Sequence, residues 1–195
     1  MPVARSETRQ SLLETARRIV AVKGYAAVGI NEVLAAAGVP KGSFYHYFAS
    51  KDAFGEAMLQ SYFDDYFAAM DGIVADKGKS SAEHLMSYWQ RFYDTQAAND
   101  CQGGCLVVKL GAEVADLSEV MRATTEIGTA AIVDRLERMI ADGIADGSVS
   151  VDESPRTTAE VLYDLWLGAS MMAKIHRSAR HLDRALTVTR QVLHA

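Results

Sequence analysis

Proline is almost absent from this chain, which leaves long stretches able to remain helical. Only three of the 195 residues are proline, at positions 2, 40 and 155. Proline breaks a helix because it lacks a backbone N–H and its ring clashes with the preceding turn. Between these positions apolar residues recur at intervals of three and four, which is the spacing of one helix face. The sequence therefore predicts an all-α fold of about nine helices.

Glycine, serine and proline indicate where these helices end and begin. Gly24 follows the first apolar stripe, Ser50 is placed to cap a long helix, and Pro40 marks a tight turn before a short one. The expected helices cover residues 8–23, 30–37, 41–48, 50–75, 81–97, 105–115, 117–142, 156–178 and 181–193. Polar or glycine-containing loops are expected at residues 76–81, 99–104 and 142–152.

The composition is that of a globular protein, with 49% apolar and 23% charged residues. No run of 18 apolar residues occurs and the N-terminus lacks an apolar signal core, so we expect no membrane partner and a cytoplasmic location. The two cysteines, Cys101 and Cys105, are too few for a secreted disulfide scaffold and are expected to be thiols. Neither catalytic residues, a cofactor nor a bound metal is expected, because no phosphate-binding loop, nucleophile elbow or histidine-rich motif is present.

Charge is distributed unevenly along the chain. The formal net charge is −5, yet residues 1–52 carry a net +3 and the remainder −8. A positive N-terminal quarter is suited to meet a polyanion that the rest of the chain repels. Residues 1–52 are therefore the candidate DNA-binding domain, and residues 53–195 the candidate regulatory and dimerisation domain.

The first three expected helices have the order of a helix-turn-helix: a helix, a short helix, a tight glycine turn and a short basic aromatic helix. Phe44 and Phe48, four residues apart, are expected to anchor the last of these. Lys41 at its start is placed to reach guanine in the major groove, and the hydroxyl groups behind it are placed to contact phosphates. The alternative for Tyr45 and His46 is core packing, since aromatic residues at helical spacing are usually buried.

Residues 41–54, Lys-Gly-Ser-Phe-Tyr-His-Tyr-Phe-Ala-Ser-Lys-Asp-Ala-Phe, resemble the recognition helix and following helix start of TetR-type repressors. The resemblance covers about the first 60 residues and implies a double-stranded DNA operator as partner. Where many of these proteins have a capping threonine that contacts phosphate, this chain has Gly29 and Ile30, with Asn31 as a possible substitute. The DNA contacts implied by the resemblance fall on Lys41, Gly42, Ser43, Tyr45, Tyr47 and Lys51.

Dimerisation follows from this expected function, because one such unit offers few cations. Two units on a palindrome place their recognition helices about one DNA turn, roughly 34 Å, apart. The resemblance implies a homodimer formed by the last two helices, here residues 156–178 and 181–193. The candidate interface residues are Ala159, Leu162, Tyr163, Trp166, Leu167, Ser170, Leu182, Leu186, Thr189 and Leu193, and an ordinary core face would use the same residues.

Cys105 follows two glycines at a predicted helix start, where unpaired N–H groups and the helix dipole favour a thiolate. Residues 104–119 and 165–174 resemble the N-ethylmaleimide reductase repressor branch of the TetR family. That resemblance implies sensing of electrophiles or oxidants at Cys105, with Lys174 nearby, and control of reductase or detoxification genes. Lys109, one turn after Cys105, is a rival partner for the thiol. Cys101 is a candidate resolving thiol, and a buried structural role for Cys105 is the alternative.

Three other interpretations remain open. A repressor released by a noncovalent small ligand, such as an unsaturated acid, would use a pocket lined by Trp89, Tyr93 and Met172, together with Met86 and Phe92. A metal sensor would combine Cys101 and Cys105 with His84 or His176. An enzyme has the least support, because Glu113 and Asp116, one turn apart, more readily form a solvated face. In every version, a shift of the helix at 50–75 would carry the signal to the recognition helices.

Overall fold

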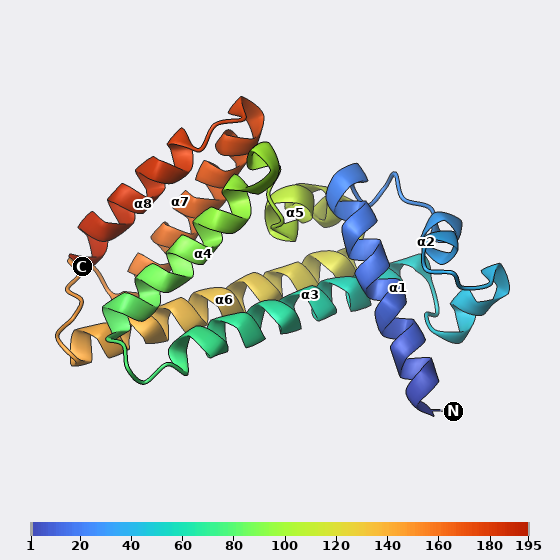
Figure 1. The fold of residues 1–195 in the computed structure, drawn as a ribbon, viewed down its shortest axis with the longest axis horizontal. Coiled ribbons are helices and arrows are strands. Elements are labelled where there is room, and N and C mark those ends of the chain that lie inside the picture. The colour runs from blue at the N-terminus through green and yellow to red at the C-terminus, as the bar shows by residue number, and fades with distance from the viewer. Residues whose placement is uncertain (1, 195) are drawn as a thin grey trace. The chain divides into compact units, whose positions relative to one another are not determined.

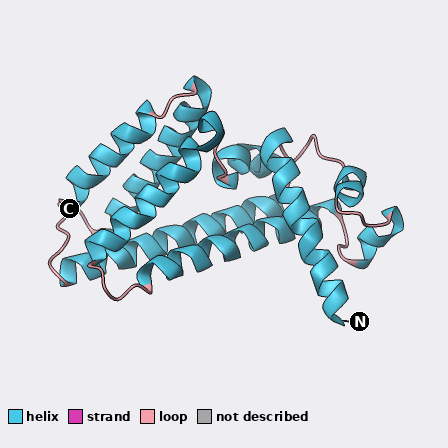
Figure 2. Ribbon diagram, viewed as in Figure 1, coloured by secondary structure: helices cyan, strands magenta, loops and turns pink. Residues whose placement is uncertain are grey.

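The computed structural model describes residues 2–194, with side chains from Ser6 onward, and this part of the chain is helical without strands (Figures 1 and 2). The predicted all-α fold of about nine helices is confirmed. The elements are α1 (Pro2–Lys23), α2 (Ile30–Ala36), the 3₁₀ helix η1 (Lys41–His46), α3 (Lys51–Val74), α4 (Ser81–Cys101), α5 (Leu106–Leu117), α6 (Glu119–Ala145), α7 (Pro155–His176) and α8 (Arg180–Leu193). No helix in the described part is both long enough and apolar enough to cross a membrane.

The chain forms two compact units. The first contains residues 2–65 and 109–128, and the second contains residues 66–108 and 129–194. The first unit thus holds the predicted DNA-binding segment together with the beginning of α3, most of α5 and the beginning of α6. The functional boundary at residue 52 stays a prediction.

An aromatic cluster forms part of the core of the first unit. Phe44, Phe48 and Phe54 are buried, with ring centroids 4.8–5.5 Å apart. Burying three phenyl rings contributes roughly 1.5–3 kcal/mol for each ring, and edge-on contacts between them add to this. Phe44 and Phe48 therefore anchor the short helix, as their spacing predicted.

The core of the second unit is built around two stacked indoles. Trp89 of α4 and Trp166 of α7 are fully buried, with ring centroids 5.2 Å apart and ring planes 11° apart. The Trp166 Nε1–H donates to Thr189 Oγ1 at 2.9 Å, which ties α7 to α8. In this unit α4, α7 and α8 lie side by side (Figure 1).

Several element ends differ from the prediction, each for a local reason. The third helix is 3₁₀ and ends at His46 rather than continuing to residue 48. Helix α4 begins at Ser81 as predicted, with Ser80 as its cap, because the Ser80 Oγ accepts from Glu83 N while Glu83 accepts from Ser80 N; the helix ends at Cys101 rather than near residue 97. Helix α6 continues to Ala145, and Gly143 lets Val149 pack against its last turns, where a Cβ would clash.

Candidate functional site

The 3₁₀ helix η1 carries four of the six residues predicted to contact DNA, whereas Tyr47 directly follows η1 and Lys51, which is half-buried, begins α3. Lys41 and Gly42 are exposed, Ser43 and Tyr47 are half-buried, and Tyr45 is 74% exposed. The core-packing alternative is wrong for Tyr45 and for His46, which is also exposed. A polar face with donors at successive turns is therefore open to solvent, while the opposite face is fixed by phenylalanines.

Tyr25 connects this segment to the loop after α1. Its hydroxyl donates to the Lys51 carbonyl oxygen at 2.6 Å, and the Lys51 Nζ lies 5.0 Å from the centre of its ring. Burial, with the nearby charge of Asp52, raises the pKa of Tyr25 to about 12, so the phenol remains a neutral donor. The backbone at the predicted phosphate contact Lys51 is thus held in place.

Helix α2 begins without a side-chain cap. Gly29 occupies the cap position and has no side chain to accept a hydrogen bond, so only its carbonyl oxygen accepts, from Glu32 N and Val33 N; Asn31 is exposed. An ion pair between Lys23 and Glu32 ties the end of α1 to α2 instead. Where many TetR-type proteins have a threonine that caps this helix, the present chain therefore lacks the side-chain capping contact.

The two cysteines border a turn of unusual backbone conformation. Cys101 and Cys105 are free thiols, 6% and 8% exposed. Asn99, Asp100 and Cys101 at the end of α4 have positive φ angles of 52°, 58° and 57°. Cys105 is the residue directly before α5, which places it at a helix start as predicted.

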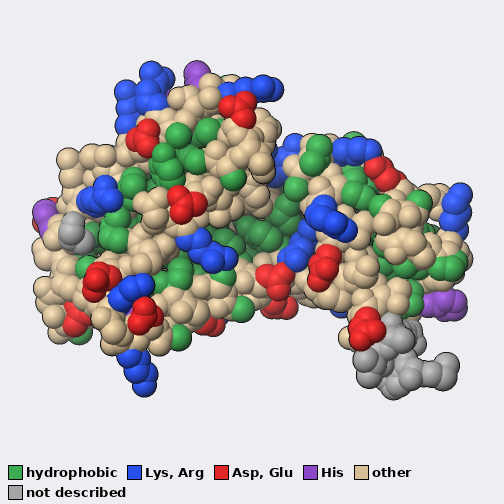
Figure 3. Space-filling model, viewed as in Figure 1, with side chains coloured by type: hydrophobic (Ala, Val, Ile, Leu, Met, Phe, Trp, Pro, Cys, Tyr) green, Lys and Arg blue, Asp and Glu red, His purple; other side chains and the backbone are tan. Residues whose placement is uncertain are grey.

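Lys174 rather than Lys109 contacts this turn. The Lys174 Nζ donates to the Gln102 carbonyl at 2.9 Å, three residues before Cys105. The Lys109 Nζ instead donates to the Val22 carbonyl at 3.2 Å. Arg177 and Arg180 lie in and directly after the turn between α7 and α8, and Lys and Arg side chains stand out at this end of the second unit, with histidine and acidic side chains among them (Figure 3).

Two buried tyrosines, Tyr88 and Tyr163, interact electrostatically with Cys105, and neither interaction was predicted from the sequence. Tyr88 and Tyr163 are both buried, and burial raises the pKa of each, with a further contribution from the charge of Cys105. The Tyr88 hydroxyl is 2.8 Å from the Tyr66 hydroxyl. These phenols come from α3, α4 and α7, so no local sequence signal links them to the cysteine.

The residues predicted to line a ligand pocket lie in different environments. Trp89 belongs to the core, and its Nε1–H has no hydrogen-bond partner. Tyr93 donates to Asp183 Oδ1 at 2.8 Å, and Met172 is exposed. Met86 alone of the wider set lines an open groove of about 680 Å³, formed by α4, Lys79 before it and Arg190 of α8.

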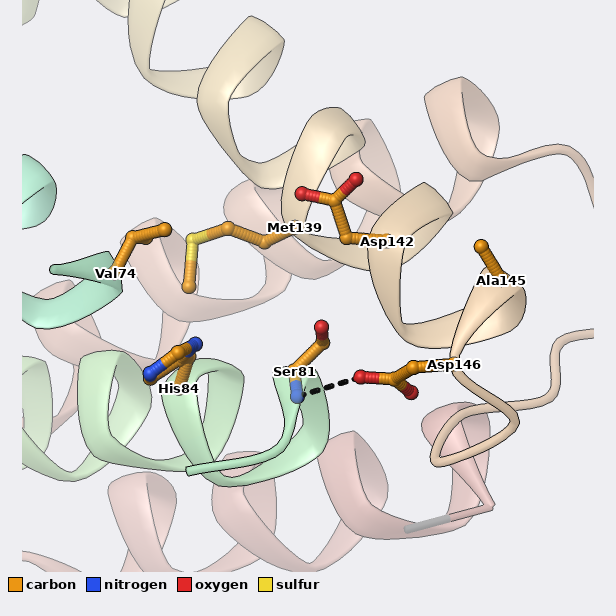
Figure 4. Close-up of a pocket in the computed structure, with 7 residues that line it drawn as sticks. All are labelled: Val74, Ser81, His84, Met139, Asp142, Ala145 and Asp146. Carbon is orange, nitrogen blue, oxygen red and sulfur yellow. Dashed lines mark hydrogen bonds between the residues drawn. The ribbon is translucent and has the colours of Figure 1, made fainter. Parts of the chain in front are cut away.

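A cavity of about 430 Å³ opens elsewhere in the second unit (Figure 4). Its lining comes from α3, α4, α6 and the residue after α6, and consists of Val74, Ser81, His84, Met139, Asp142, Ala145 and Asp146. Asp146 Oδ2 accepts from Ser81 N at 3.0 Å, and His84 Nε2 lies 2.8 Å from the Asp76 carbonyl. These polar groups hold the start of α4, which is a structural role.

The residues of the metal and enzyme alternatives are engaged elsewhere. Within the described part of the chain, no three His, Cys, Asp or Glu side chains are arranged to hold a metal ion. His176 stacks on His181 with ring centroids 5.2 Å apart. Glu113, expected on a solvated face, is half-buried and accepts from two backbone N–H groups of the first unit.

The prediction of the dimer-interface residues is wrong for most of them. Most of them are buried within the protein's own core, including Leu162, Trp166, Ser170, Leu182 and Leu193. Hydrophobic periodicity predicted the inward face of each helix and did not distinguish it from an interface. Apolar side chains that α7 leaves accessible include another stripe, which consists of Val161, Leu165, Met172 and Ile175 around Gly168, and Met171 is exposed outside it.

A helix-turn-helix with an exposed recognition segment, joined to a larger helical unit, defines a bacterial DNA-binding regulator. The chain belongs to the TetR family: residues 12–58 match the bacterial regulatory proteins of the tetR family, and residues 81–189 match the tetracyclin repressor-like C-terminal domain. It is thus a transcriptional repressor of the TetR type and not an enzyme.

Among its relatives is the HTH-type transcriptional repressor NemR of Escherichia coli (strain K12). The two are 36% identical over 187 residues, which are 96% of this chain and 94% of NemR. The crystal structure of reduced E. coli NemR superposes with a TM-score of 0.91 over 96% of this chain and 97% of that one. The HTH-type transcriptional repressor DhaR of Mycobacterium sp. (strain GP1) is 32% identical over 98% of this chain and 94% of DhaR.

Proposed function

We propose that this repressor binds a palindromic operator as a homodimer and releases it when Cys105 reacts with an electrophile or oxidant. The observation that carries the proposal is the position of Lys174, whose Nζ lies 2.9 Å from a carbonyl of the cysteine turn. A cation near a thiol and a position at a helix start each favour the reactive thiolate. The genes controlled would be those of reductases or detoxification enzymes, as the resemblance implies.

The proposed DNA contacts are Lys41, Gly42, Ser43, Tyr45, Tyr47 and Lys51. Their support is the exposure of Lys41, Gly42 and Tyr45 on η1. A Cβ at Gly42 would meet no other atom of the protein, so the surface there is open for the DNA backbone to approach. Lys41 would read guanine, and the hydroxyl groups and Lys51 would contact phosphates.

The homodimer would form through α7 and α8. The exposed α7 stripe around Gly168 spans positions 161, 165, 168, 172 and 175, which is the alternating four-and-three spacing that packs one helix on another. Val188 adds an exposed apolar side chain on α8. Twofold symmetry would then pair this surface with the same surface of the second subunit.

In the proposed chemistry, the Cys105 thiolate adds to an electrophilic carbon. With N-ethylmaleimide, a new S–C bond forms, the ring C=C bond becomes a single bond, and the neighbouring carbon takes a proton from water. The thioether enlarges a side chain that is 92% buried, and well-packed surroundings do not accommodate added volume without shifting.

The test is operator binding at fixed salt, with DNA from upstream of the protein's own gene, before and after N-ethylmaleimide treatment. Salt is fixed because phosphate-dominated affinity falls steeply as it rises. Wild type and Cys101→Ser are expected to release the operator, and Cys105→Ser to stay bound. Release of Cys105→Ser together with wild type would overturn the thiol mechanism.

Release of the operator from untreated protein by a carboxylic acid that does not react with thiols would instead favour the noncovalent alternative. The specific observation behind that alternative is the Trp89 Nε1–H, a buried donor without an acceptor. Crotonate and butyrate, as an unsaturated and a saturated acid, would be compared in the same assay with Cys105→Ser.

A further inference from the structure

Glu113 of α5 holds the backbone of the loop that follows α1. Its Oε1 accepts from Ala26 N at 2.8 Å, and its Oε2 accepts from Tyr25 N at 3.1 Å. Both oxygens of one carboxylate thus bind successive backbone donors. Such charge-assisted hydrogen bonds are stronger than neutral ones and fix the direction of the backbone.

The loop is shaped to receive this carboxylate. Gly24 has a φ of +84°, and a Cβ there would lie 3.1 Å from Glu113 Oε2. Lys109, one turn earlier on α5, donates to the Val22 carbonyl at 3.2 Å. Two side chains on one face of α5 therefore hold residues 22–26, which we call the α1 end loop.

From the α1 end loop, contacts continue to the DNA-facing segment. The Tyr25 side chain donates to the Lys51 carbonyl, and its ring lies beneath the Lys51 ammonium. Lys51 is a proposed phosphate contact and begins α3 directly after η1 and its short connection. The Glu113 carboxylate is therefore connected through one residue, Tyr25, to the proposed DNA-binding residue Lys51.

The other end of α5 begins at the proposed sensor. Cys105 directly precedes Leu106, and the apolar face of the helix is buried at Leu106, Leu110 and Val114. Helix α5 runs without a break from residues 106–108 of the second unit into residues 109–117 of the first, and a packed helix shifts as a rigid element because a packed interior does not deform continuously. A change of volume at Cys105 would then act on a helix whose third turn carries Glu113.

We propose that Glu113 is a positioning residue that couples the state of Cys105 to operator binding, with Lys109 as its second contact on the α1 end loop. The inference rests on the proposed function, in which modification of Cys105 releases DNA. It adds α5 to the route through α3. Linkage of two sites through a shared element is a coupling free energy, so it is measured as a ratio of affinities.

The experiment measures operator Kd before and after N-ethylmaleimide treatment for wild type, Glu113→Ala, Glu113→Gln and Asp116→Ala. Asp116→Ala removes an exposed carboxylate from the same helix and serves as the matched control. For wild type and Asp116→Ala, we expect the treated Kd to exceed the untreated one by on the order of 10–100-fold. For Glu113→Ala the ratio should fall below about threefold, and Glu113→Gln, which keeps one acceptor oxygen, should lie between.

A second readout needs no variant of Glu113. Hydrogen exchange of the Tyr25 and Ala26 amides is expected to be slow in the untreated protein and to accelerate after Cys105 is alkylated. The same treatment of Cys105→Ser should leave both amides protected. A purely structural role for Glu113 predicts no change in exchange on alkylation, because the hydrogen bonds would not depend on the state of the thiol.

The outcomes separate the two proposals. If wild type keeps its operator affinity after alkylation, the sensor proposal fails and this inference falls with it. If wild type is released and Glu113→Ala is released by the same ratio, or if amide exchange does not change, only the role of Glu113 is overturned. Should Glu113→Ala fail to fold, the Glu113→Gln ratio and the wild-type exchange data decide the question.

Discussion

At the scale of single residues, Gly103 is required by both conformation and space. Its φ is +55°, and a Cβ would clash with the Oε1 of the buried Gln96. Gly103→Ala is expected to lower the free energy of unfolding by about 1–3 kcal/mol. Gly104→Ala is the matched control, because a Cβ there would make ordinary contact with Thr95 Cγ2 at 3.5 Å. Urea unfolding of both variants checks this; equal loss in the two would contradict it.

Lys174 and Lys109 provide a second comparison at this scale. If the Lys174 ammonium favours the Cys105 thiolate, Lys174→Met should slow alkylation by N-ethylmaleimide several-fold near neutral pH. The difference from wild type should shrink in alkaline solution, where the thiol ionises without help. Lys109→Met, which removes the cation bonded to Val22, should leave the rate unchanged. A rate loss in Lys109→Met alone would reverse the assignment.

The residue scale also shows where prediction from sequence stops. The inward positions of Phe44 and Phe48 follow from their spacing, as does the position of Cys105 at a helix start. The choice between the two lysines does not, because Lys174 is 72 residues from its partner Gln102. Glu113 was missed for the same reason: its partners are backbone N–H groups 87 and 88 residues away, and no side-chain pattern marks a backbone donor.

At the scale of elements, most helices were predictable because amphipathic spacing and capping residues agree. The exceptions are ends decided by tertiary contacts. A loop at residues 99–104 was predicted, but nothing in the sequence indicated the positive φ angles of Asn99, Asp100 and Cys101, and α6 continues past residue 142, where Val149 packs over Gly143. The buried face of α7, with Leu162, Trp166 and Ser170, was assigned to the dimer interface because a core face and an interface have the same periodicity, and only burial separates them.

The start of α4 gives a pH prediction for an element. Hydrogen bonds from Ser80 lower the pKa of Glu83, and those from Ser148 and Ser81 lower the pKa of Asp146. A lowered pKa in the folded state stabilises the protein above the ordinary carboxyl pKa, and this contribution is lost as pH falls through the folded value. The melting temperature of Glu83→Gln should therefore lie below that of wild type near neutral pH, and the gap should close on acidification.

Glu137→Gln is a suitable control for that comparison, because Glu137 lies in α6 and its carboxylate forms a long ion pair, 3.4 Å, with Arg156. Its gap from wild type should be small throughout, since exposed ion pairs contribute little. A Glu83→Gln gap that persists unchanged in acid would show that the capping carboxylate acts through shape rather than charge.

At the scale of the whole molecule, the chain must bring two DNA-binding units together despite its net charge of −5. Repulsion between like-charged copies has to be offset by an apolar contact, and the α7 stripe offers one. Operator affinity should then depend on dimerisation as well as on η1. Variants of the two surfaces are separable, because a change in η1 should weaken DNA binding without changing the oligomeric state.

Val161→Glu tests the dimer surface alone, because Val161 is exposed and its replacement should not disturb the protein's own core. Val161 lies at one end of the stripe, and Ile175 lies fourteen positions later at the other. An unpaired carboxylate buried at an interface costs about 2 kcal/mol or more, and twofold symmetry introduces it twice. We expect a monomer by sedimentation at micromolar concentration and a matching loss of operator binding. Ile127→Glu places the same charge on an exposed apolar site of α6 and should leave both unchanged. A dimer that survives in Val161→Glu would move the interface away from this face of α7, and the two recognition segments would then need another element to set their spacing.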